Sequence, residues 1–247
     1  MTTDENLYLF DLRGFVVLEN VLGLDTVRDL NRILDAHLPA SARPELANQV
    51  FQDFLLWDGA LRDLLTHERI TPLLCNVVDR RIRLDRYYGL RMAPGTTGVP
   101  LHGGAGHVPD EAEYYQFANG TMRNGITTVS WALTDMLAEN GGFACIPGSH
   151  KSNLPKPESL SEEQCVTHVP LRAGDVLVFT GTLAHRGTYW AGPHERRSLL
   201  FKYAPRHLAW SPAYVTWPRE LLDRLTDQQR VLFDAPHVFD GGGIGVG

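Results

Sequence analysis

The chain has 247 residues, of which 43% are hydrophobic and 21% are charged, and its formal net charge is −6 at pH 7. These values fit a globular protein with one large domain or two small ones, and they argue against a nucleic-acid partner. Three cysteines without a Cys-x-x-Cys pair argue against a disulfide framework and fit a reducing cytoplasm. The N-terminus lacks a secretory signal and no stretch reaches the roughly 20 apolar residues of a membrane span, so we expect a cytoplasmic protein.

The first third of the chain is predicted to be mainly helical. A short strand is expected at Phe15–Leu18, and residues 24–38 carry apolar side chains at helical spacing, with Asp25 as the predicted N-cap. Residues 59–78 are predicted to form further helix, interrupted near Pro72.

From about residue 82 the pattern changes to short β-type runs separated by Gly, Pro and Asn. These runs include RIRLDRYYGLRM, GITTVSWALTDM, GDVLVFTG and RRSLLFKYAP. Several short strands after a helical part predict an all-β barrel or sandwich with helices packed outside it. Residues 218–233 are predicted to form one further helix, followed by the mobile end DGGGIGVG.

Two of the ten histidines have a context that suggests chemistry. His102 ends an apolar run and enters a glycine turn, whereas His185 follows a Gly-Asp turn and a strand. Both positions place an imidazole at the mouth of the predicted barrel. Most of the other histidines are interpreted as ordinary surface or core residues.

An arginine pair opens the strand that follows His185. Because strand neighbours point to opposite faces, either Arg196 or Arg197 can face the barrel interior, and Ser198 shares a face with Arg196. A buried guanidinium must be paired, and a ligand carboxylate matches it bidentately. The alternative is a surface arginine pair.

Three sequence blocks carry a resemblance: GFVVLENVL, SWALTDMLAENGGFACIPGSHK at 130–151, and GDVLVFTGTLAHRG with RRSLLFKY after it. Over roughly residues 10–205 the chain resembles the phytanoyl-CoA dioxygenase family. The resemblance implies a mainly β fold with flanking helices and a double-stranded β-helix (jelly-roll, cupin-like) core. It implies one domain over residues 1–247, with a helical part at about 1–80, the β core at about 82–205 and a C-terminal helical tail.

Most members of that family bind iron(II) and 2-oxoglutarate through His-x-Asp, a distal His and an Arg on the next strand. By position, the resemblance makes His102 and His185 the iron ligands. It gives the distal carboxylate of 2-oxoglutarate to Arg196, with Ser198 beside it. His150, in PGSHK, belongs to the family signature without being an iron ligand, and we expect it to support the structure or the substrate site.

Gly104 departs from the family pattern because it stands where the iron-binding carboxylate is expected. Halogenases of this type have Gly or Ala there, and chloride takes the vacated position on the iron. The resemblance therefore favours a halogenase that uses iron(II), 2-oxoglutarate, chloride and molecular oxygen to chlorinate an unactivated C–H bond. The substrate would be a small metabolite of secondary metabolism, such as antibiotic biosynthesis.

Glycine at position 104 is also compatible with a hydroxylase or with a protein that is not an enzyme. A hydroxylase could take a third ligand from the following loop, where His107, Asp110, Glu111 and Glu113 are candidates, or could complete its iron shell with water. A non-catalytic relative could bind a metabolite without iron, although it would have no reason to keep both histidines and the arginine.

The wider site is predicted from alternation and loop length. Alternation puts Trp131 on one face of its strand and Ser130 on the other. Trp131 and Thr127 are candidates for the cosubstrate pocket. The long loop after His102 is a candidate for substrate contacts, which we place at Tyr114, Tyr115, Phe117 and Arg123. Arg186, directly after His185, is a further candidate for the substrate. Arg83, Arg86 and Arg91, with Tyr87 and Tyr88 between them, favour an anionic substrate with a ring, such as a nucleoside or nucleotide.

Overall fold

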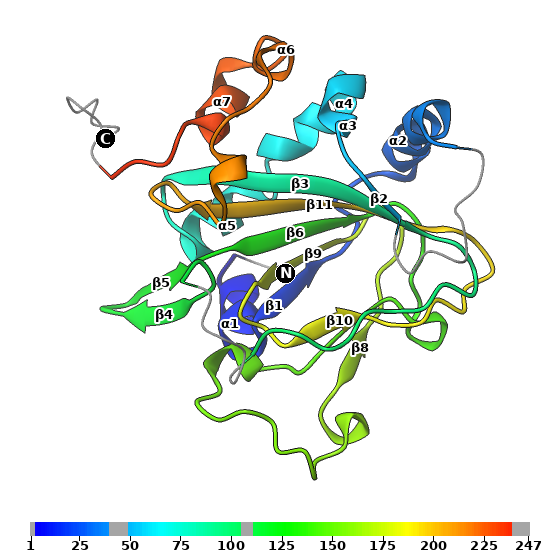
Figure 1. Ribbon diagram of the computed structural model, residues 1–247, viewed down its shortest axis with the longest axis vertical. Coiled ribbons are helices and arrows are strands. Elements are labelled where there is room, and N and C mark those ends of the chain that lie inside the picture. Colours follow the sequence, from blue (N-terminus) through cyan, green and yellow to red (C-terminus); the bar gives the residue numbers. More distant parts are fainter. Residues whose placement is uncertain (1–2, 40–48, 105–110, 239–247) are drawn as a thin grey trace.

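The computed structural model describes residues 3–39, 49–104 and 111–238 (Figure 1). Its helices are α1 (Thr3–Arg13), α2 (Leu24–His37), α3 (Phe54–Trp57), α4 (Gly59–Asp63), α5 (Thr71–Val77), α6 (Arg219–Leu222) and α7 (Asp227–Arg230). Its strands are β1 (Phe15–Leu18), β2 (Gln49–Phe51), β3 (Ile82–Met92), β4 (Tyr115–Ala118), β5 (Thr121–Asn124), β6 (Thr127–Ala132), β7 (Phe143–Cys145), β8 (Thr167–Val169), β9 (Val176–Thr180), β10 (His185–Gly187) and β11 (Arg196–Pro205). None of the helices in the described ranges has the length and apolar character needed to cross a membrane.

The strands form two antiparallel sheets and a separate hairpin. The large sheet has the order β1-β9-β6-β11-β3-β2, the small sheet has the order β10-β7-β8, and β4 pairs with β5. Figure 1 shows α2, α3, α4, α6 and α7 over one face of the large sheet and the small sheet across its other face. This mainly β arrangement with flanking helices is the predicted cupin-like fold.

Strand β11 shows how the large sheet separates two interiors. Leu199, Phe201 and Tyr203 are fully buried on the helix-covered side, in one apolar core with Trp131. The intervening residues of β11 point toward the small sheet, where Met92, Met136, Phe143 and Phe179 form a second core. We call these two sides the helix face and the inner face of the large sheet.

Most element predictions agree with the structure, and the differences have local causes. The strand at Phe15–Leu18 is present, but α2 is preceded by Gly23 as N-cap, so Asp25 lies in its first turn and pairs with Arg28 instead. Pro72 stands in the first turn of α5 rather than interrupting a helix, because the backbone N–H donor that proline lacks is not needed there.

The two ends of the chain differ more from the prediction. Residues 3–13 form a helix with almost no amphipathic pattern, which is the reason it was not predicted. The expected single helix at 218–233 is divided into α6, α7 and a final 3₁₀ turn because Thr226 caps a new helix start. The glycine-rich end, residues 239–247, lies outside the described residues.

Candidate active site

His102 and His185 lie side by side between the two sheets. Their backbones form an isolated antiparallel bridge, with hydrogen bonds of 3.1 Å from His102 N to His185 O and 2.8 Å from His185 N to His102 O. The centroids of the two rings are 4.3 Å apart. Two histidines separated by 83 positions in the sequence are thereby presented as one pair.

Each imidazole is oriented by its own chain segment. His102 Nδ1 donates to the carbonyl of Pro100 at 3.0 Å, and His185 Nδ1 donates to the carbonyl of Leu183 at 2.6 Å. Because Nδ1 carries the proton in both rings, each Nε2 keeps a lone pair, which is the form in which histidine binds a metal.

Electrostatics keep His185 neutral. Burial, followed by the neighbouring His102, lowers the pKa of His185 to about 3, although its bond to the Leu183 carbonyl opposes the shift. Phe143 and Phe179 cover the ring, with centroid distances of 5.6 and 4.8 Å. The ring is thus available as a neutral ligand at any pH near 7.

Arg196 faces the same cavity from the start of β11. The cavity has a volume of about 290 Å³ and is lined by both histidines, Ser130 and Arg196, among others. The guanidinium is buried, and in the described residues it donates only to sulfur, from Nε to Met136 Sδ at 2.9 Å and from Nη1 to Met92 Sδ at 3.1 Å. Burial without a compensating anion lowers the pKa of Arg196 to about 10.

Arg197 has the opposite environment although it is the next residue. Its guanidinium bonds Glu195 at 2.6 Å and Asp35 of α2 at 2.7 Å. These carboxylates raise the pKa of Arg197 despite its partial burial. The ion pairs of Arg197 therefore hold its side chain on the helix face, and Arg196 is the arginine that could bind a ligand carboxylate.

Ser198 lies on the inner face beside Arg196, as the alternation predicts. It is buried, and its Oγ is 3.9 Å from Met136 Sδ.

Gly104 closes a tight turn next to the histidine pair. Its φ is +77°, and a Cβ at this position would stand 2.9 Å from the Cβ of Ala184. Its N–H donates to the carbonyl of Thr182 at 2.9 Å. The local backbone therefore requires glycine here, and Gly104 lines a neighbouring cavity of about 450 Å³ rather than the one that holds Arg196.

The candidates for a third iron ligand divide into three groups. His107 and Asp110 lie outside the described residues, and Glu111 is exposed. Glu113 approaches the turn before His185, since a Cβ on Gly181 would be 2.9 Å from Glu113 Oε1. Within the described ranges, no group of three or more His, Cys, Asp or Glu side chains is arranged to hold a metal.

Trp131 and Thr127, predicted for the cosubstrate pocket, lie on the helix face of β6. Trp131 is fully buried and meets His67 edge-on at 5.3 Å, and Thr127 Oγ1 donates to the carbonyl of Gly125. Ser130, which points the other way, lines the cavity instead. Alternation in the sequence predicted that Trp131 and Ser130 lie on opposite faces, but it did not indicate which face lines the cavity.

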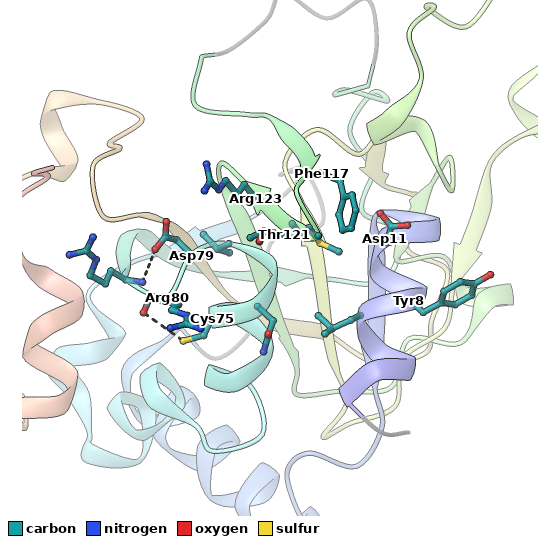
Figure 2. A pocket seen from close by; sticks show the side chains of 14 residues that line it. Tyr8, Asp11, Cys75, Asp79, Arg80, Phe117, Thr121 and Arg123 are labelled. Atoms are coloured by element: carbon teal, nitrogen blue, oxygen red, sulfur yellow. Dashed lines mark hydrogen bonds between the residues drawn. The ribbon is translucent and has the colours of Figure 1, made fainter. Parts of the chain in front are cut away.

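Two predicted substrate residues, Phe117 and Arg123, lie elsewhere. They line a separate hollow of about 760 Å³ between α1, the end of α5 and the β4–β5 hairpin (Figure 2). Tyr114 packs near Gly125, and Tyr115 donates to Asp11 of α1. The loop after His102 thus sends these side chains to the hairpin side of the molecule.

His150 contacts α1 and does not line the cavity that holds Arg196. Its Nε2 donates to the carbonyl of Asp11 at 3.1 Å, and its ring meets Tyr115 edge-on at 4.7 Å. Burial lowers its pKa to about 4. Arg186, by contrast, does line the cavity, but its guanidinium pairs at 2.6 Å with Glu162, which does not line it.

The other arginines proposed for an anionic ring are engaged in structural ion pairs. Arg83 and Arg86 both bond the buried Asp85, at 3.2 and 3.1 Å, and Arg91 bonds Glu195 at 2.5 Å. Of this segment, Tyr88 and Leu90 line the cavity. Lys202 also lines it, and it was missed although its position six residues past Arg196 puts it on the same face of β11.

The donor set fits iron(II) and 2-oxoglutarate. Two imidazoles whose Nδ1 atoms bond backbone carbonyls can turn Nε2 toward a divalent metal, and a buried guanidinium that lacks a carboxylate in the described structure suits the distal carboxylate of the cosubstrate. His102 and His185 would hold the metal, and Arg196 would hold 2-oxoglutarate.

Comparison with known proteins supports iron and 2-oxoglutarate as the cofactors. Residues 10–198 match the family model of phytanoyl-CoA dioxygenase. The chain belongs to the phytanoyl-CoA dioxygenase family. It is 25% identical over 238 residues to the dioxygenase af480 of Aspergillus fumigatus, covering 91% of this chain and 74% of that protein. It is 26% identical to the iron/alpha-ketoglutarate-dependent dioxygenase penM of Penicillium thymicola, covering 86% and 72%.

A solved structure shows the same architecture. HygX from Streptomyces hygroscopicus, with nickel and 2-oxoglutarate bound, superposes with a TM-score of 0.74 at 25% identity, covering 85% of this chain and 89% of that one. HygX has also been solved with hygromycin B bound. As a member of the phytanoyl-CoA dioxygenase family, the chain is an oxidoreductase of the non-haem iron- and 2-oxoglutarate-dependent type.

Proposed function

We propose that this protein oxidises an unactivated C–H bond of a small metabolite, with iron(II), 2-oxoglutarate and molecular oxygen. The observation that carries the proposal is the shared cavity, which a histidine pair and a buried arginine both face; in the described part of the chain that arginine has no carboxylate partner. When bound, iron(II) and 2-oxoglutarate supply oxygen activation and removal of a hydrogen atom from carbon.

The residues of the chain have separate tasks in this reaction. The carbonyls of Pro100 and Leu183 fix the two imidazoles with Nε2 toward the metal. Arg196 supplies a bidentate fork for the cosubstrate, and its burial strengthens that contact. Phe143 and Phe179 shield His185 from water.

The geometry favours hydroxylation over chlorination. The positive φ of Gly104 and the closeness of Ala184 account for glycine at this position without invoking a halide. The third ligand of a hydroxylase would then come from the loop after Gly104, as Asp110, Glu111 or Glu113; Glu113 lies against Gly181, before His185, but forms no three-ligand cluster with the two histidines in the described structure. The two relatives named above, af480 and penM, are dioxygenases by name.

Chlorination is the second candidate, and a specific observation favours it. Gly104 has no side chain, and the described residues contain no cluster of three protein ligands. A chloride ion would then take the position that a carboxylate takes in a two-histidine, one-carboxylate site.

Hygromycin B, bound by HygX, supports a polar secondary metabolite as the substrate class. We therefore place the protein in secondary metabolism, such as antibiotic biosynthesis. The ion-paired Arg83, Arg86 and Arg91 do not support a nucleotide.

An anaerobic chloride titration tests the choice between the two outcomes. Protein loaded with iron(II) and 2-oxoglutarate is titrated with sodium chloride, and the visible charge-transfer band is followed, with sodium sulfate as the control. We expect that chloride does not shift the band, because a hydroxylase does not bind chloride on its iron. A saturable shift with chloride alone would establish chlorination, and the absence of any band would refute the proposed cofactors.

A further inference from the structure

The guanidinium of Arg196 is held by two sulfur atoms. Met136 Sδ accepts from Nε at 2.9 Å and Met92 Sδ accepts from Nη1 at 3.1 Å. All three side chains are buried, with exposed fractions of 7% for Arg196, 1% for Met92 and 0% for Met136. Two thioethers on one buried guanidinium are an unusual choice, because a buried charge is normally paired with a carboxylate.

The backbone fixes where both methionine side chains begin, and packing limits where they can go. Met92 ends β3 and is the register partner of Arg196 in β11. Met136 is bound twice to Leu171, by backbone hydrogen bonds of 2.7 and 2.9 Å. Gly142 lies close beside Met136, since a Cβ built on it would stand 3.4 Å from Met136 Cβ. Both side chains are buried in the core of the inner face, which restricts the positions open to their sulfurs.

Sulfur supplies orientation without neutralising the charge. A thioether is a weak, uncharged acceptor, so it directs the N–H groups of the guanidinium and leaves its positive charge for another partner. Arg197 shows the contrast, since Glu195 and Asp35 satisfy its charge within the protein. A carboxylate in place of either methionine would compete with any incoming anion.

We infer that Met92 and Met136 form a thioether seat that positions Arg196 for the distal carboxylate of 2-oxoglutarate. This inference rests on the proposed function, because it takes Arg196 as the cosubstrate arginine. Without the seat the guanidinium samples other rotamers, and binding must restrict them again. Met92 and Met136 are therefore positioning residues, and they act through Arg196.

The test compares two acids that differ only at the distal end. 2-Oxoglutarate and 2-oxovalerate, which has a methyl group where the former has its distal carboxylate, are titrated calorimetrically into manganese(II)-loaded protein. The variants are Met92→Leu, Met136→Leu and their combination, which nearly conserve core volume. Met122→Leu is the control, because Met122 is buried in the core of the helix face. Urea unfolding verifies that each variant folds.

We expect each single variant to raise the dissociation constant of 2-oxoglutarate about three- to tenfold, and the double variant to raise it further. The dissociation constant of 2-oxovalerate should stay within about twofold, as should both constants in the control. An unchanged 2-oxoglutarate constant in the double variant overturns the seat, and so does an equal loss for both acids. If Arg196→Gln itself leaves 2-oxoglutarate binding intact, the proposed role of Arg196 fails instead.

Discussion

The two faces of the large sheet use the same strands for different purposes. On the helix face, Arg197 meets two carboxylates and Leu199 is fully buried among other apolar side chains. On the inner face, one residue away in each case, Arg196 donates only to sulfur among the described residues and Leu200 borders a cavity. The helix face pairs its arginine with carboxylates, whereas the inner face keeps a charge and two imidazoles facing a cavity. The difference marks the functional side of the sheet more clearly than any single residue does.

Substituting a proposed iron ligand on the inner face should have the largest effect, which is on iron(II) binding. His185→Gln is expected to abolish stoichiometric iron(II) binding, because one imidazole cannot hold the metal alone, and anaerobic loading followed by metal analysis measures it. His150→Gln is the matched control, since His150 is also buried but bonds the Asp11 carbonyl. Equal iron content in both variants would contradict the assignment of His185.

Substituting each of the two neighbouring arginines in turn tests directly whether the two faces differ in their ability to bind the cosubstrate. Arg196→Gln should weaken 2-oxoglutarate binding by about 2–5 kcal/mol, because the distal carboxylate loses its charged partner. Arg197→Gln should leave that affinity within a few fold, since its partners are Glu195 and Asp35. Calorimetry on manganese(II)-loaded protein measures both, and a reversed order would transfer the role to Arg197.

Substitutions of the adjacent Leu199 and Leu200 compare how tightly the two faces are packed, through the free energy of unfolding. Leu199→Ala should lower the free energy of unfolding by about 2–5 kcal/mol, because it leaves a void in a fully packed core. Leu200→Ala should cost less, because its side chain already borders a cavity. Urea unfolding compares the two variants, and equal losses would show that the inner face is packed as tightly as the helix face.

The smallest effect is expected from His150, which tests whether a buried histidine by itself indicates a ligand. Burial lowers its pKa from 6.5 to about 4, so the unfolded chain takes up a proton first as the pH falls. The contribution to stability is complete above about pH 6.5 and is lost toward pH 4, by about 2 kcal/mol at pH 5. Urea unfolding at pH 7.5 and pH 5 should show a smaller loss in His150→Gln than in the native sequence, and parallel losses would contradict this role.

The sequence predicted the parts of this site that depend on alternation and on family pattern. The strand patterns placed Arg196 and Ser198 together, and the structure does bring His102, His185 and Arg196 to one cavity. The family resemblance named Arg196, but the strand pattern alone could not choose between Arg196 and Arg197, because Arg197 is paired with Asp35, 162 positions before it in the chain.

The predictions that depend on tertiary placement were less successful. Trp131 and Ser130 were correctly put on opposite faces, but only the packing of the helices shows that Trp131 belongs to the core. Phe117 and Arg123 follow His102 in a long loop, yet the β4–β5 hairpin carries them to another hollow. Gly104 was interpreted as a missing carboxylate, and its positive φ and contact with Ala184 give a conformational reason for it.

The pairing of β1 with β9 has a consequence for how the protein is made. Phe15 is the register partner of Phe179, and His102 must wait for His185 before their backbone bridge can form. On the ribosome, the first strand therefore emerges long before its partner exists, and such distant pairings slow folding. The histidine pair can be assembled only after His185 has been synthesised, 83 positions after His102, so the pair forms late relative to its first member.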